Sequence, residues 1–239
     1  MTADFATMAG LEGVPAALAG ARDAVDSLLR DRGHRRTTAT VTAAALLNGA
    51  SASARLEGSR STLSDLQEGS ADKLAVASAR LSAELLSLVP VVVRSPLQAV
   101  ARMHALAAAG LVDDAELGRP LPRPGLAIAL QDLARRLLAP TDAPAIAVAA
   151  LAHAEVMRLA PFTVANGLVA RGLERLLLVA RGVDPASVTV PEAGHLALSA
   201  EYADALSAYS RADPAGQRRW LYHAVAAITR GVELSPLNQ

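Results

Sequence analysis

The chain has 239 residues, with 23 basic and 23 acidic side chains, so its formal net charge is zero. A neutral chain lacks the long-range attraction that draws strongly basic proteins to nucleic acid or anionic lipid, and we expect neither as a partner. The sequence contains no cysteine, which excludes disulfides, thiolate metal sites and a cysteine nucleophile.

The composition favours helices. Hydrophobic residues make up 52% of the chain but aromatic residues only 3%, because most apolar residues are Ala, Leu and Val. Ala and Leu are strong helix formers, apolar residues recur at three- and four-residue spacing, and no segment alternates convincingly like a strand. We therefore predict an all-α fold with a flexible N-terminus over 1–13 and a single helical domain over 14–239.

The sequence indicates a soluble, cytoplasmic protein. The first ten residues lack the basic and apolar regions of a signal peptide. Apolar runs such as 143–152 reach about half of the ~20 residues that a membrane span needs. Nearly all basic residues are Arg, which we interpret as the codon bias of a GC-rich, bacterial genome.

Capping and breaking residues set the expected helix ends. Asn48-Gly49 marks a stop, Pro90 another, and Ser95-Pro96 is a start signal with Ser as N-cap and Pro in the first turn. Three prolines over 118–125 predict an extended loop. The predicted helices are 14–30, 37–47, 53–58, 71–89, 96–110, 126–138, 143–159, 166–180, 200–210 and 214–231.

A turn between two of these helices carries the most informative residues. Pro161 and Phe162 anchor a loop that leads to Ala165, Asn166 and Gly167 at the start of the next helix. The first backbone N–H groups of a helix have no partner within the helix and lie at the positive end of its dipole. Because glycine has no side chain to obstruct an anion, we predict an anion-binding loop over 165–167.

Residues 160–171 read A-P-F-T-V-A-N-G-L-V-A-R and resemble the signature of the Fic family, H-P-F-x-[DE]-G-N-G-R-x-x-R. That family transfers nucleotide monophosphates from ATP onto protein hydroxyls. The matching residues are Pro161, Phe162, Asn166, Gly167 and Arg171. The resemblance covers roughly 51–231 and implies a Fic-like helical domain.

The residues that carry the chemistry in the family are replaced. Ala160 stands in place of the catalytic His, Val164 in place of the metal-binding carboxylate, and Leu168 in place of the first Arg. Neither Ala160 nor Val164 accepts a proton or ligates a hard cation. The resemblance therefore implies a degenerate member with no catalytic residue, no metal site and no cofactor.

A second motif lies far upstream. Residues 53–58, S-A-R-L-E-G, resemble the inhibitory-helix motif [ST]-x-x-x-E-[GN] through Ser53, Glu57 and Gly58. In relatives this Glu pairs with the second Arg of the signature, so the resemblance implies a lock pair of Glu57 and Arg171. The β-hairpin flap that holds targets in relatives corresponds here to the proline-broken segment 111–125.

We expect a catalytically inactive Fic-like pseudoenzyme that binds an unidentified protein partner or, weakly, a nucleotide; a homodimer is compatible with the sequence. One alternative is a Fic-like nucleotidyl (AMP) or phosphoryl transferase with a rewired active site, which would use ATP and Mg²⁺ and need a substitute base such as His153. Another is a structural or antitoxin-like subunit.

Overall fold

The computed structural model describes residues 4–30 and 38–238. Within these residues the regular elements are all helical, and the only β-type contact is an isolated bridge between Ala109 and Val112. In chain order the elements are α1 (Phe5–Ala9), α2 (Val14–Arg30), α3 (Ala39–Leu56), α4 (Leu63–Glu68), α5 (Lys73–Glu84), η1 (Leu85–Leu88), α6 (Val89–Val92), α7 (Pro96–Ala108), η2 (Asp114–Glu116), α8 (Leu126–Leu138), α9 (Ala145–Leu159), α10 (Asn166–Ala180), α11 (Pro191–Ala197), α12 (Ser199–Ser210), α13 (Pro214–Glu233) and η3 (Pro236–Asn238).

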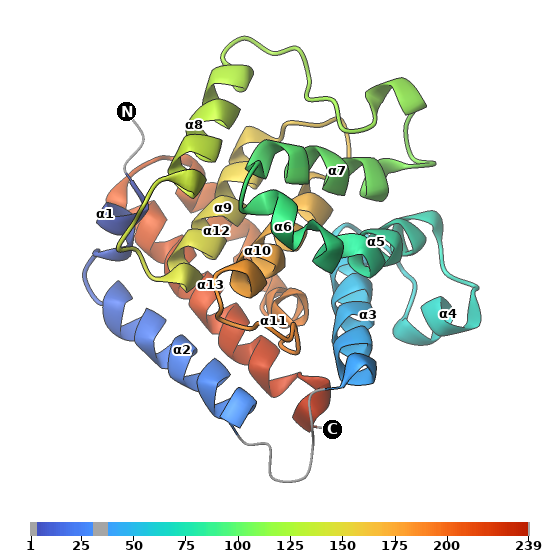
Figure 1. Ribbon diagram of the computed structural model, residues 1–239, viewed down its shortest axis with the longest axis horizontal. Coiled ribbons are helices and arrows are strands. Elements are labelled where there is room, and N and C mark those ends of the chain that lie inside the picture. Colours follow the sequence, from blue (N-terminus) through green and yellow to red (C-terminus); the bar gives the residue numbers. More distant parts are fainter. Residues whose placement is uncertain (1–3, 31–37, 239) are drawn as a thin grey trace.

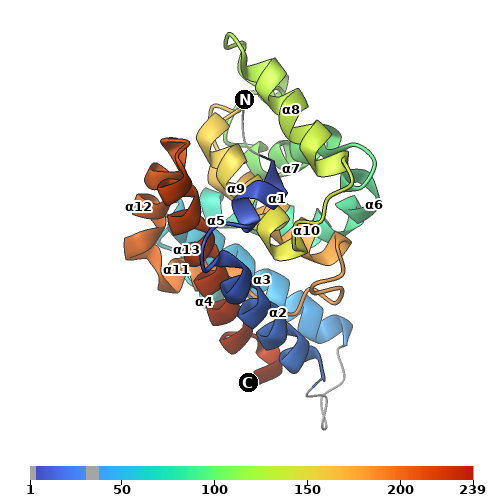
Figure 2. The same cartoon turned by 90° about the vertical axis from the view of Figure 1, so that its left-hand side faces the viewer.

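Two helices form the centre of the domain (Figures 1 and 2). α9 is buried continuously over 146–156 and α10 over 167–178. Apolar residues occur on every face of both helices, which suits a position surrounded by other helices. α9 packs against α8, α12 and α13, whereas α10 packs against α3, α6 and α7. The loop between these central helices is therefore held on both sides by the core.

The expectation of a flexible segment over 1–13 was wrong for the residues that the structure describes. Residues 5–9 form α1, with Asp4 as N-cap accepting a hydrogen bond from the Thr7 backbone. Phe5 and Met8 are 2% and 0% exposed, and α1 contacts α9 and α13. Burial of these two large side chains stabilises α1 against the core. The expectation of flexibility took account only of the position of this segment at the terminus.

The predicted break at Asn48-Gly49 was also wrong. α3 runs uninterrupted through both residues, and the short helix expected over 53–58 is the end of α3; the expected start at Thr37 lies outside the described residues. Gly49 faces the side chains of Arg175 and Glu192, and a Cβ there would lie 2.9 and 2.8 Å from their nearest atoms. The glycine therefore serves close packing, not a turn.

Most other helix predictions are confirmed to within a few residues, and 14–30, 126–138 and 166–180 are matched at both ends. The predicted helix 71–89 instead ends as α5 at Glu84 and tightens into η1, and Pro90 lies in the first turn of α6. α4 and α11 were not predicted.

By length and composition alone Lys73–Val92 could cross a membrane, but core helices meet the same criterion, and here α5 contacts α3 and α7.

Candidate functional site

The loop 160–165 turns sharply at both ends. Ala160 and Ala165 have φ values of 39° and 60°, in the left-handed region that residues with a Cβ adopt rarely. Asn166 holds the loop closed: its Oδ1 accepts from the Phe162 backbone N–H at 3.0 Å, and its Nδ2 donates to the Phe162 carbonyl at 2.8 Å. The Asn166 side chain therefore shapes the loop.

Phe162 packs the loop against the core. It is 3% exposed and stacks face to face on His104, with ring centroids 3.8 Å apart. Burial lowers the pKa of His104, so the imidazole is neutral at pH 7. Its Nδ1 accepts a hydrogen bond from the Gly118 backbone at 2.9 Å, which ties the loop to the segment that follows α7.

Residues 111–125 contain no hairpin and fold over the loop instead. The Leu121 backbone N–H donates to the Pro161 carbonyl at 2.8 Å. The guanidinium of Arg123 donates to the carbonyls of Leu159 and Ala160. Leu121 and Arg123 thus direct these polar groups to the loop 160–165 itself.

The two motifs meet at Arg171, which is 1% exposed. Its Nη2 donates to Glu57 Oε1 at 2.7 Å and to the Ser53 carbonyl at 3.1 Å. Its Nε donates to Ser53 Oγ at 2.8 Å and its Nη1 to the Tyr202 hydroxyl at 3.0 Å. The Glu57 side chain is 24% exposed, so the pair is buried at the arginine and hydrated at the carboxylate. Burial opposes the charge of Arg171, but Tyr202 and Glu57 keep its pKa above the ordinary value.

Glu57 also covers the predicted anion-binding loop. A Cβ on Gly167 would lie 1.9 Å from Glu57 Oε1, so the carboxylate sits directly against the glycine at the start of α10. Ala165 and Gly167 are buried. The space next to the first turn of α10 is therefore filled by the protein's own carboxylate, a group that a helix N-terminus favours.

A buried chain of polar side chains continues from Arg171 into the core. Tyr202 links Arg171 to His153, whose Nε2 lies 2.8 Å from the hydroxyl. His153 Nδ1 lies 2.7 Å from Glu174 Oε2, and the same oxygen lies 2.9 Å from His195 Nε2. Burial raises the pKa of Tyr202 to about 12 and lowers that of His153 to about 4. Burial opposes ionisation of Glu174, but interactions with the two histidines hold its pKa well below the ordinary value.

Sequence patterns alone did not identify Glu174, Arg175 or His195 as members of this site. One signal was present: Arg171, Glu174 and Arg175 share one face of α10, at i, i+3 and i+4 spacing, and they are its only charged residues. Charged residues on such a helix need buried partners. Arg175 finds Glu192, with hydrogen bonds of 2.8 and 2.6 Å.

Apolar side chains occupy the three signature positions that differ from the family pattern. Leu168 is 1% exposed and lies within the core, and Val164 packs against it. Ala160 is the C-cap of α9. None of these three side chains can accept a proton, ligate a cation or donate a hydrogen bond to a phosphate.

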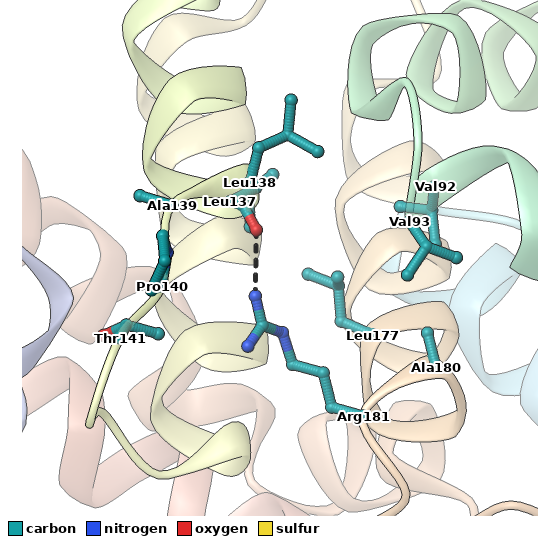
Figure 3. Close-up of a pocket in the computed structure, with 10 residues that line it drawn as sticks. All are labelled: Val92, Val93, Leu137, Leu138, Ala139, Pro140, Thr141, Leu177, Ala180 and Arg181. Carbon is teal, nitrogen blue, oxygen red and sulfur yellow. Dashed lines mark hydrogen bonds between the residues drawn. The ribbon is translucent and has the colours of Figure 1, made fainter.

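A pocket of about 320 Å³ lies at the other end of α10 and α8 (Figure 3). Val93, Leu138 and Leu177 are among the residues that line it, and Arg181 reaches across to donate to the Leu137 carbonyl at 3.0 Å. Because α10 is about 20 Å long, the pocket at its C-terminal end is remote from the loop 160–165 at its N-terminal end. Arg181 places its positive charge at the C-terminal end of α8, a favourable position for a cation.

The fold is similar to that of solved Fic proteins. A Fic family protein from Desulfovibrio desulfuricans G20 superposes with a TM-score of 0.73 at 17% identity, over 90% of this chain and 73% of that chain. Fic-1 from C. elegans superposes with a TM-score of 0.61 at 19% identity, over 92% of this chain and 74% of that chain. No protein-family model matches the chain, and no curated protein matches its sequence. The protein therefore has the all-helical Fic fold.

Proposed function

We propose that this chain is a catalytically inactive Fic-like protein that works by binding a protein partner, with at most weak affinity for nucleotide. The observation that carries the proposal is the set Ala160, Val164 and Leu168 in a loop that is otherwise well formed. General-base catalysis alone contributes ~10²–10⁴-fold to a rate, and metal and arginine stabilisation of phosphoryl transfer add to this. Loss of all three groups removes measurable transfer.

The lock pair supports the same proposal. In an active relative a Glu paired with the second Arg restrains an enzyme, whereas here it has no chemistry to restrain. Glu57 and Arg171 instead join α3 to α10 through contacts that also include Ser53 and Tyr202. We therefore interpret the pair as a contact that stabilises the fold and does not regulate catalysis.

The rewired-transferase alternative has a difficulty. Its candidate base, His153, is 0% exposed and both ring nitrogens are hydrogen-bonded to Tyr202 and Glu174. A general base must come within about 3 Å of the proton that it removes. His153 has no route to a substrate hydroxyl without opening the core, so this alternative needs another base.

Calorimetric titration with Mg·ATP tests the proposal. We expect dissociation constants weaker than ~1 mM for the wild type and for Glu57→Gly, because Val164 and Leu168 remove two charge-assisted contacts worth about 1.5–3 kcal/mol each. Glu68→Gly is the control, since it removes a carboxylate from the last residue of α4, away from the loop.

A dissociation constant below ~10 μM for the wild type would contradict the proposal. Tight binding that appears only in Glu57→Gly, and not in Glu68→Gly, would also contradict it. That result would mean that the nucleotide site is intact and merely covered by Glu57.

A further inference from the structure

Three helices bring two histidines and a glutamate to one point in the core. His153 comes from α9, Glu174 from α10 and His195 from α11, and each is at most 1% exposed. One potential ligand atom from each residue, Nδ1, a carboxylate oxygen and Nε2, lies within 4.8 Å of the other two. Glu174 Oε2 is 2.7 Å from His153 Nδ1 and 2.9 Å from His195 Nε2.

Hydrogen bonds alone leave this cluster incomplete. Glu174 Oε2 receives both imidazoles, whereas Glu174 Oε1 is buried and has no hydrogen-bond partner among the described residues. Buried carboxylate oxygens nearly always have a hydrogen-bond partner. An oxygen without one calls for an explanation, and a bound ion is one. The oxygen belongs to the same carboxylate on which both histidines converge.

Among the described residues, no arginine forms a direct ion pair with Glu174. The two arginines nearest to it on α10 are engaged elsewhere: Arg171 binds Glu57, and Arg175 binds Glu192 with two hydrogen bonds. A cation held between the three side chains would balance the charge of this buried carboxylate.

Each histidine also has a polar partner on the ring nitrogen that lies away from Glu174. His153 Nε2 lies 2.8 Å from the Tyr202 hydroxyl, and His195 Nδ1 lies 3.1 Å from His223 Nε2. Outer hydrogen bonds of this kind fix the ring and the tautomer of a ligating imidazole.

We propose that His153, Glu174 and His195 form a buried structural zinc site, with both Glu174 oxygens completing the coordination. Two imidazole nitrogens and a carboxylate suit Zn²⁺ and neighbouring transition metals, whereas Mg²⁺ and Ca²⁺ take oxygen ligands. Small shifts of the side chains bring the ligand atoms to the ~2.0–2.2 Å that zinc requires. The site joins α9, α10 and α11 and is independent of nucleotide chemistry.

The test measures the metal content of the full chain. The protein is expressed in zinc-supplemented medium, purified without chelator and analysed by plasma mass spectrometry; a second portion is unfolded with chelator and refolded with Zn²⁺ or with EDTA. We expect about one zinc per chain with zinc present, and a higher melting temperature than in EDTA. Refolding with Co²⁺ should give the visible absorption of a four-coordinate site.

Two variants locate the metal. Glu174→Gln should lose the zinc, whereas Glu192→Gln, which changes a neighbouring buried carboxylate outside the proposed ligands, should keep it. If Glu174→Gln does not fold, the zinc content and cobalt spectrum of the wild type still decide. Wild-type protein without zinc and with equal melting temperatures would overturn the proposal and leave a hydrogen-bonded core, as would equal zinc content in both variants.

Discussion

Arg171 makes more contacts with the rest of the site than its motif partner does. It donates four hydrogen bonds, to two atoms of Ser53, to Glu57 and to Tyr202, while fully enclosed by α3, α10 and α12. Glu57 keeps 24% of its side chain exposed. Removal of Glu57 therefore leaves a buried cation that keeps Ser53 and Tyr202 as partners. Removal of Arg171 leaves a hydrated carboxylate and a cavity.

We predict that Arg171→Ala lowers the free energy of unfolding by about 3–5 kcal/mol, because it leaves the groups around a large buried side chain unpaired. Glu57→Ala should cost about 1.5–3 kcal/mol, the range for one hydrogen bond to a charged group. Urea unfolding followed by circular dichroism measures both. The double variant should cost less than the sum of the single variants, since the residues share a contact. Variants as stable as the wild type would show that the pair contributes nothing to the fold.

At the scale of helices, Gly49 shows how a packing demand changes the meaning of a residue. α3 passes so close to the Arg175–Glu192 pair that a Cβ at this position would lie 2.8 Å from Glu192 Oε2. Helix propensity alone favours Ala over Gly by about 1 kcal/mol. The steric conflict with two hydrogen-bonded, buried side chains outweighs that gain.

We predict that Gly49→Ala lowers the free energy of unfolding by about 1–3 kcal/mol, the usual penalty of overpacking. Gly20→Ala is the matched control: Gly20 lies in α2, is exposed, and a Cβ there has no atom within 4 Å. It should stabilise the protein by about 0.5–1 kcal/mol. Thermal or urea unfolding of the two variants gives the comparison, and stabilisation by both substitutions would refute the close approach of α3 to α10.

The helices that sequence analysis located have their own capping and breaking residues. The Pro in the first turn of α7 and of α13 and the apolar spacing of α2, α8 and α10 are local signals. Asn48-Gly49 misled because the same dipeptide marks turns and close packing, and only the neighbouring helix decides. α1 was missed because its order comes from burial of Phe5 and Met8 against distant helices.

The candidate site divides in the same way. The contact of Glu57 with Arg171 followed from two motifs that occur in the same order as in relatives, and the role of the pair remains a prediction. His195, Tyr202 and His223 come from α11, α12 and α13, and no spacing in the sequence links them to α10. Their convergence depends on how the C-terminal helices pack, which is information that only the fold contains.

For the whole molecule, the central proposal is that a protein with the Fic fold lacks the transfer activity of the family. The direct measurement is transfer of label from α-³²P-ATP onto protein hydroxyls, with Mg²⁺, by the wild type and by Glu57→Gly, using the chain itself and a cell lysate as acceptors. Because Ala160, Val164 and Leu168 leave no base, metal ligand or phosphate clamp, we predict no labelled protein in either case. Labelled protein with the wild type, or its appearance on removal of Glu57, would contradict the account.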